Sequence, residues 1–206
     1  MLSVTVWTPI KFISICVVKQ CAMCIKRLIL VLVVLFVNCE SSRESQCIDY
    51  YKTGNNFDLT TLQGNWYAVY FWPPNSRQRR SCEVINFKKS SQDEIISLQS
   101  ACSSANVSGN MKIVQSSYVN NVGKLTTVTY YGDDEVKSLY RSCDRIYKYL
   151  FIPVKNNYVM GINCSSGGRG VLLAKYLESA TAIQSTVESI DAMNGREGSP
   201  DCPLKL

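Results

Sequence analysis

The cysteines are the residues of this chain whose number and spacing point most clearly to a chemistry, either disulfide formation or metal binding. The sequence of 206 residues has ten cysteines and no histidine. Four cysteines precede residue 40, near an apolar segment at the N-terminus; those that follow are Cys47, Cys82, Cys102, Cys143, Cys164 and Cys202. Their wide spacing disfavours a zinc site, which needs close pairs of ligands. An even number of cysteines in a secreted domain indicates disulfides, here three.

The remaining reactive groups give little support to an enzyme. Without histidine the chain has no His-based catalytic triad, no His-ligated haem and few ways to build a metal site. The acidic cluster Asp133–Glu135 lies in turn-like sequence, where a solvated surface is its expected role. We therefore expect no catalytic residue, no metal and no cofactor.

An apolar segment near the N-terminus indicates secretion. Lys26-Arg27 precede an uninterrupted apolar run over residues 28–37. This run is shorter than the ~20 residues of a membrane-spanning helix, and it matches the hydrophobic part of a signal peptide. Residues 1–39 are therefore interpreted as a signal-peptide region, and residues 40–206 as one secreted, extracellular domain. A signal anchor is the alternative, although no stable membrane span is expected.

The start of the leader is unusual. The first part of a signal peptide is normally short and basic, but the segment 1–22 is long and already apolar. Met23, in contrast, is followed closely by the basic pair Lys26-Arg27. We therefore expect translation to start at Met23. The alternative is that residues 1–22 are a variable extension of the leader.

Removal of the leader changes the charge of the chain. The full sequence has 22 basic and 16 acidic residues, and four of the basic ones precede residue 40, which leaves 18 against 16. A nearly neutral domain gives no reason to expect a nucleic-acid partner or a membrane surface.

Short strand-like segments separated by turn signals fill most of the mature chain. We expect strands at 65–72, 82–88, 94–102, 110–118, 124–131, 145–152, 158–164 and 169–177. The segment 135–144 is ambiguous: it either extends the strand at 124–131 or forms a loop. From Ser179 the apolar residues recur at helical spacing, with Asn194-Gly195 as a stop signal.

This pattern predicts an all-β fold. The expected architecture is an eight-stranded antiparallel up-and-down barrel (calyx) with one C-terminal α-helix packed outside. A two-sheet sandwich with Greek-key connections is the alternative. An eight-stranded barrel can hold one small ligand in its interior.

The first strand begins with Gly64-Asn65-Trp66. A Gly-x-Trp at this position, behind a leader and before a series of strands, resembles the signature of the lipocalin family. Two further motifs match in part: Tyr158 keeps the tyrosine of the second, and Lys175 replaces the arginine that covers Trp66 in the third. A lysine can still make a cation–π contact with that ring. The resemblance is to divergent, insect-type lipocalins, similar to bilin-binding and salivary members.

The resemblance also implies a disulfide pattern. In insect lipocalins a cysteine before the Gly-x-Trp pairs with one that ends the seventh strand, which here implies Cys47–Cys164. A second bridge joins the start of the second strand to the C-terminal tail, which here implies Cys82–Cys202. Cys102–Cys143 would be an extra bridge.

The resemblance and the apolar strands indicate a secreted carrier of a small hydrophobic ligand, of the fatty acid, retinoid or bilin class, bound in the barrel interior. Trp66 is expected to close the barrel floor, with Gly64 and Lys175 as further structural residues. A solid, filled interior is the alternative for these strands. Strand alternation assigns the following residues to the inward, ligand-binding face: Ala68, Tyr70, Ile85, Phe87, Met111, Ile113, Thr126, Val128, Tyr130, Tyr158, Met160, Ile162, Val171 and Leu173.

The loops suggest a second function. Some blood-feeder lipocalins that this chain resembles bind proteins, so the alternative is a protein-binding lipocalin of the protease or haemostasis inhibitor type that acts through its loops. The basic loop Arg77–Arg80 is the first candidate. In a carrier, Arg77, Arg79 and Arg80 would instead surround the mouth and attract a carboxylate. Asn106-Val107-Ser108 is a glycosylation sequon in an expected loop, which would make the protein a glycoprotein.

The interpretation of residues 1–39 predicts the N-terminus of the mature protein. Edman sequencing of secreted protein should begin near Glu40, because the apolar run must be removed by signal peptidase. An N-terminus before Leu28 would contradict a cleaved leader.

Overall fold

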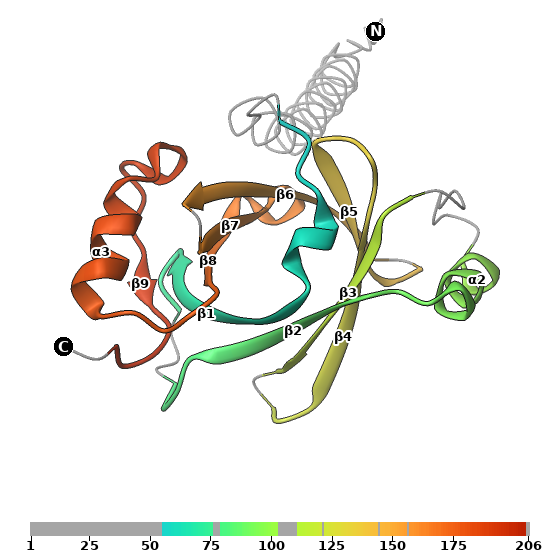
Figure 1. Cartoon of the computed structure of the whole chain (residues 1–206), viewed down its shortest axis with the longest axis horizontal. Coiled ribbons are helices and arrows are strands. Elements are labelled where there is room, and N and C mark those ends of the chain that lie inside the picture. The colour runs from blue at the N-terminus through green and yellow to red at the C-terminus, as the bar shows by residue number, and fades with distance from the viewer. Residues whose placement is uncertain are drawn as a thin grey trace, which may run out of the picture. The chain divides into compact units, whose positions relative to one another are not determined.

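The first strand closes the fold. In the computed structural model, β1 (Gly64–Trp72) pairs antiparallel with both β2 (Glu83–Lys89) and β8 (Arg169–Ala174). The strands between them are β3 (Ile113–Val119), β4 (Leu125–Tyr131), β5 (Val136–Ser142), β6 (Arg145–Lys155) and β7 (Tyr158–Asn163). They pair in chain order, which makes an up-and-down barrel of eight strands (Figure 1). The predicted barrel is confirmed.

The structure describes residues 55–75, 79–102, 111–120, 122–143, 145–155 and 157–204. A short ninth strand, β9 (Ser199–Pro200), pairs with β1 beyond the barrel. The interpretations of Met23 and residues 1–39, and those of Cys47, Arg77 and Asn106, lie outside the described residues. No helix in the described ranges is long and apolar enough to cross a membrane.

The side chains of β1 alternate between the inside and the outside of the barrel, and this alternation is reversed partway along the strand. Trp66 and Ala68 pack inside the barrel. The register with β8 shifts between Ala68 and Tyr70, which is a bulge, and after it Phe71 packs inside while Tyr70 packs outside. The inward orientation expected for Tyr70 is therefore wrong, because one extra residue in a strand reverses the faces of those that follow.

The segment predicted as a strand at 94–102 is a helix, α2 (Gln92–Ala101). Ser91 and Glu94 form a capping box: Ser91 Oγ accepts from the Glu94 N–H at 3.3 Å, and Glu94 Oε2 accepts from the Ser91 N–H at 2.9 Å. Leu98, at helical spacing from Ile95, packs on the outer face of the barrel against Ile113 and Tyr131. In the described part of the chain the barrel thus carries two α-helices, where the sequence predicted one.

Two other boundaries differ from expectation. The ambiguous segment 135–144 contains a full strand, β5, which restores the number of strands to eight. β6 continues through Pro153 to Lys155, with a register shift against β7 between these two residues. Proline is tolerated where a ladder is irregular, so Pro153 does not end the strand.

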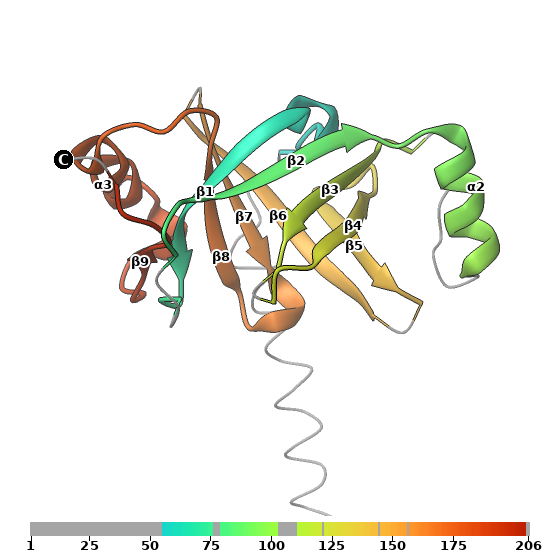
Figure 2. The ribbon, with the colours of Figure 1, turned by 90° about the horizontal axis from the view of Figure 1, so that it is seen from below.

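The predicted C-terminal helix is α3 (Ala180–Glu188), and it begins at an N-cap, Ser179, whose Oγ accepts from the Ala182 N–H at 3.3 Å. It ends at Glu188, earlier than the Asn194-Gly195 signal. Ile183 packs in a buried cluster with residues of β1, β7 and β8 on the outside of the barrel. Figure 2 shows α3 and α2 on opposite sides of the barrel.

One end of the barrel is closed by η1 (Leu59–Leu62) and Trp66, and we call it the closed end. Leu59 and Leu62 are completely buried. Trp66 Nε1 donates to the Leu62 carbonyl at 2.7 Å, and Lys175 Nζ lies 5.0 Å from the centre of the Trp66 ring, the cation–π contact expected from the sequence. Lys175 also donates to the Gln63 carbonyl at 2.9 Å.

One of the three implied disulfides is present in the described part of the chain. The structure contains the Cys82–Cys202 disulfide, which joins the start of β2 to the C-terminal tail. Cys143 Sγ lies 3.0 Å from the carbonyl oxygen of Ala101, the residue before Cys102. The third bridge, Cys102–Cys143, stays a prediction that this proximity favours. Cys164 is buried, and its expected partner precedes the described ranges.

Trp66→Ala is expected to destabilise the fold strongly. The side chain is 5% exposed and its indole donates a buried hydrogen bond, so truncation should lower the free energy of unfolding by ~3–5 kcal/mol in urea denaturation. Lys175→Met is the companion variant, since it removes the cation above the ring and its hydrogen bond to the Gln63 carbonyl but keeps the indole; each contact is worth only about 1 kcal/mol. If Trp66→Ala unfolds at the same urea concentration as the parent, Trp66 does not close the barrel.

Candidate ligand-binding cavity

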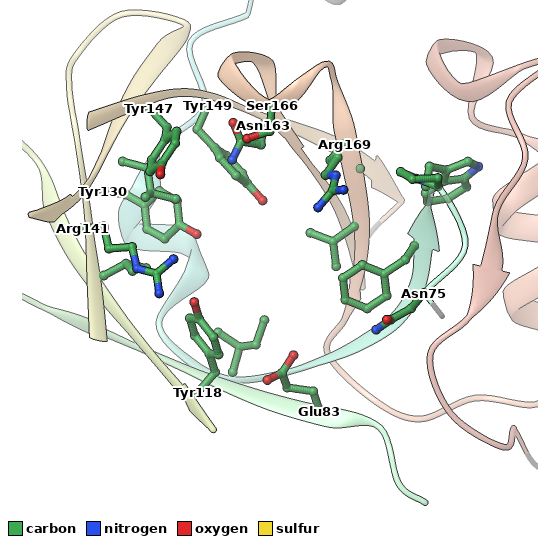
Figure 3. A pocket seen from close by; sticks show the side chains of 18 of the residues that line it. Asn75, Glu83, Tyr118, Tyr130, Arg141, Tyr147, Tyr149, Asn163, Ser166 and Arg169 are labelled. Carbon is green, nitrogen blue, oxygen red and sulfur yellow. The ribbon is translucent and has the colours of Figure 1, made fainter. Parts of the chain in front are cut away.

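A cavity of about 740 Å³ occupies the half of the barrel opposite the closed end, which we call the open end. The open end is formed by the β1–β2, β3–β4, β5–β6 and β7–β8 connections. Figure 3 shows polar side chains pointing into the space from several strands. The cavity is lined by Phe71, Trp72, Pro73, Pro74, Asn75, Arg79, Glu83, Ile85, Tyr118, Val128, Tyr130, Leu139, Arg141, Tyr147, Tyr149, Asn163, Ser166, Arg169, Gly170 and Val171.

The cavity is shallow because aromatic side chains fill the barrel below it. Tyr130, Tyr149 and Phe151 pack together with ring centres 5.0–5.2 Å apart. Phe57 stacks on Phe151 from the closed end at 5.5 Å. On β7, Gly161 leaves the space that Tyr149 takes, since a Cβ there would lie 2.7 Å from the Tyr149 hydroxyl. The interior is thus filled in its closed half and hollow in its open half.

Two arginines bring positive charge to the cavity wall. Arg141 comes from the end of β5 and Arg169 from the start of β8, and Figure 3 shows both guanidinium groups turned into the space from different sides. Neither forms an ion pair with any residue in the described part of the chain. A guanidinium group binds carboxylates in a bidentate manner, so this wall suits a ligand with an anionic group.

A third arginine is already engaged. Arg79 Nη1 lies 2.9 Å from Glu83 Oε1, and Arg79 Nε lies 3.5 Å from Asp201 Oδ2. The Asp201 side chain is fully buried, and Asn75 Nδ2 donates to its Oδ1 at 3.0 Å. The expectation that Arg79 attracts a ligand carboxylate at the mouth is therefore wrong, because two carboxylates of the protein occupy it. Arg80 is exposed and does not line the cavity.

Burial shifts the titration of several groups around the cavity. Desolvation raises the pKa of Glu83, and the nearby Arg79 offsets only part of that effect. Desolvation likewise raises the pKa of Tyr118 and of Tyr130, the latter strongly. The tyrosine hydroxyls therefore stay protonated at neutral pH and can donate hydrogen bonds to a ligand.

The structure brings only some of the predicted ligand-binding residues to the cavity. Ile85, Val128, Tyr130 and Val171 line it. Ala68, Phe87 and Leu173 face inward but belong to the filled part of the interior. Thr126 lies near the open end of β4 and is not part of the lining.

The inward orientation expected for the remaining residues is wrong. Tyr158, Met160 and Ile162 of β7 pack outside, in the cluster under α3. Met111 and Ile113 pack outside under α2. In both places a helix covers the outer face, so both faces of the strand are apolar and alternation cannot tell them apart.

Several cavity residues were missed by strand alternation. Tyr147 and Tyr149 lie on β6, and Leu139 and Arg141 on β5, the segment whose structure was left open. The signal for β6 was available, since alternate residues Tyr147, Tyr149 and Phe151 are all aromatic. Arg169 gave no comparable signal, because a charged residue at a strand end is normally solvated.

Nothing in the described ranges resembles a metal site. No group of three or more Cys, Asp or Glu side chains in these ranges has an arrangement that could hold a metal ion. The polar groups of the cavity are arginines, tyrosines, amides, one serine and one glutamate, which suit hydrogen bonding and charge pairing with an organic ligand.

The raised pKa of Glu83 predicts a pH-dependent stability. An acid whose folded-state pKa lies above its ordinary value of 4.5 holds its proton longer in the folded than in the unfolded chain. The fold should therefore lose stability relative to Glu83→Gln as the pH rises from about 4.5 through the folded-state pKa, and the difference should then stay constant. Urea denaturation across this range measures it, with Glu197→Gln, an exposed site, as the control. A stability difference that grows in favour of the parent with rising pH would contradict the shift.

Comparisons with known proteins found only matches of low sequence identity and low structural similarity. The sequence matches no protein-family model and no curated protein. Lobster apocrustacyanin A1 has 8% identity, with 79% of this chain and 84% of that chain covered at a TM-score of 0.42. Apocrustacyanin C1 has 8% identity, with 81% and 86% covered at 0.43. Insecticyanin from the tobacco hornworm Manduca sexta has 16% identity, with 71% and 80% covered at 0.35.

The strand topology is the stronger observation. Eight antiparallel strands follow one another around a closed barrel, the first begins with the Gly-x-Trp motif, and a helix near the C-terminus packs on the outside. In its architecture, therefore, the chain has a lipocalin-like fold.

Proposed function

We propose that this protein is a secreted carrier that binds one small amphipathic ligand in the open half of the barrel. The observation that carries the proposal is the cavity of about 740 Å³ into which Arg141 and Arg169 project. A cavity of this size, apolar in part and with a few convergent polar groups, is typical of small-molecule sites. The Cys82–Cys202 disulfide supports secretion, because such bridges persist in oxidising compartments.

The shape of the cavity narrows the ligand class. A long saturated chain needs a deep, narrow interior, but Tyr149 and Phe151 fill the barrel below the cavity. Aromatic walls suit a rigid, conjugated ligand, which can stack on tyrosine rings. Among the expected classes, we infer that a retinoid acid or a bilin fits better than a fatty acid, with its carboxylate directed to Arg141 or Arg169.

Binding rather than catalysis follows from the chemistry of the same residues. The hydroxyls of Tyr118 and Tyr130 are poor nucleophiles, because burial raises the pKa of both groups and keeps them protonated. The Glu83 carboxylate is engaged by Arg79 in an ion pair at 2.9 Å, which leaves it less available to take a proton from a ligand. We therefore keep the proposal that the protein is not an enzyme.

The proposal predicts a preference for an acid over the matching alcohol. Retinoic acid and retinol, added to purified protein and followed by tryptophan quenching, should both bind, and a saturated fatty acid should bind more weakly. The double variant Arg141→Gln/Arg169→Gln should lose more affinity for the acid than for the alcohol. Since both arginines are exposed, each should contribute only ~0.2–1 kcal/mol, a few-fold in affinity, which falls at high salt.

Arg80→Gln is the matched control, because it removes an exposed arginine that does not line the cavity. Equal losses for acid and alcohol in the double variant would contradict a role for the two arginines. No binding of any compound, and no small molecule carried by the protein in native mass spectrometry, would favour the alternative of a protein-binding module that acts through its loops.

A further inference from the structure

Aliphatic side chains gather on the outer face of the barrel at its open end. Val119 and Leu125 are cross-strand partners on β3 and β4, and they are 52% and 65% exposed. Val84 on β2 is 44% exposed, and the pairing of Asn86 with Ser117 places it on the same outward face as Val119. Val122, at the tip of the β3–β4 hairpin, is 82% exposed. We call these four residues the open-end patch.

Hydrogen bonds to Asn120 fix the backbone of Val122 and Lys124 at the hairpin tip. Asn120 Oδ1 accepts from the backbone N–H groups of Val122 and Lys124, each at 3.0 Å. The Asn120 N–H donates to the Lys124 carbonyl at 2.9 Å, and Gly123 adopts a left-handed φ of 77° that completes the turn. Val122 is therefore held in water by an ordered turn, at a cost that a partner surface would remove.

Positive charge accompanies the patch. Lys124 lies between Val122 and Leu125 and is exposed, and Arg80 is exposed in the β1–β2 connection at the same end. The hairpin segment 113–131 contains no acidic residue. The mature chain as a whole is nearly neutral, so these cations matter through their position beside aliphatic side chains rather than through the net charge.

We propose that the open end docks on an anionic lipid surface, with the open-end patch inserted at the interface and Lys124 and Arg80 against the headgroups. The four partly exposed aliphatic side chains of the open-end patch present far less area than the ~800 Å² that each partner buries in a stable protein complex. A lipid surface needs no complementary pocket, and basic residues beside apolar ones add electrostatic attraction to shallow insertion.

Docking at this end would bring the cavity mouth to the membrane, where an amphipathic ligand could enter or leave without crossing water. This consequence rests on the proposed function, whereas the docking itself does not. Vesicle binding by ligand-free protein tests the docking, and ligand binding without vesicles tests the carrier. Each can therefore fail independently of the other.

The test is co-sedimentation of the mature protein with vesicles of phosphatidylcholine alone or of phosphatidylcholine and phosphatidylserine in equal parts. The parent should bind the anionic vesicles more tightly, and the difference should shrink at high salt. Val122→Ser/Leu125→Ser should weaken binding about tenfold or more by removing apolar contact. Lys124→Gln and Arg80→Gln should each weaken it about fivefold and only on anionic vesicles.

Leu177→Ser is the matched control for the aliphatic variants, because Leu177 is 53% exposed but follows β8 beyond the closed end. It should leave vesicle binding unchanged. Absence of binding by the parent, or an equal loss in Leu177→Ser, would overturn the proposal. So would a dimer of the parent in analytical ultracentrifugation that Val122→Ser/Leu125→Ser abolishes, since the patch would then be an interface between two copies.

Discussion

The pairing of β1 with two neighbours is the constraint on which the rest of the structure depends. Residues 64–68 of β1 pair with β2, and residues 67–72 pair with β8. Closure leaves the barrel without an exposed edge and gives every strand an inside and an outside. Because β1 also carries Trp66 at one end and Phe71 at the other, the strand that closes the barrel contributes both to its floor and to its cavity.

The sequence was sufficient for the architecture because strand composition, turn signals and the late helix all indicate the same barrel. The sequence was insufficient to assign secondary structure where a strand-like composition and a helix signal occur in the same segment. Residues 94–102 have apolar side chains that suit a strand, but Ser91 and Glu94 form a capping box, and that local signal decided for α2. The strand count nevertheless came out right, since the unassigned segment supplied β5.

The candidate site was harder to predict than the fold, and the reason is the covering of the barrel by helices. On β7, Met160 packs under α3 while Val159 packs inside, so neighbours on both faces are apolar and buried. A period of two then reveals a strand without revealing its inner face. On β1 a bulge reverses the faces halfway along. The charged residues of the cavity, Arg141 and Arg169, required the closed barrel itself to bring β5 and β8 to one space.

The open end is fixed by contacts between segments far apart in the sequence. Arg79 joins Glu83 to Asp201, the Cys82–Cys202 disulfide lies beside this cluster, and the Asp201 N–H donates to the Val69 carbonyl at 3.2 Å. These contacts hold the β1–β2 connection and the C-terminal segment at one side of the mouth before any ligand arrives.

A mouth that is already ordered costs a ligand less conformational entropy than a loop that must close over it. The arrangement also explains why three arginines near the mouth have different roles. Arg79 neutralises two buried carboxylates, whose burial without a partner would be unfavourable. Because Arg79 pairs with Glu83 and Asp201, those carboxylates do not pair with Arg141 or Arg169, and these two guanidinium groups can bind an anionic ligand. In the proposed function, the preference of the cavity for an anionic group would therefore depend in part on a buried ion cluster that holds Arg79 away from the ligand.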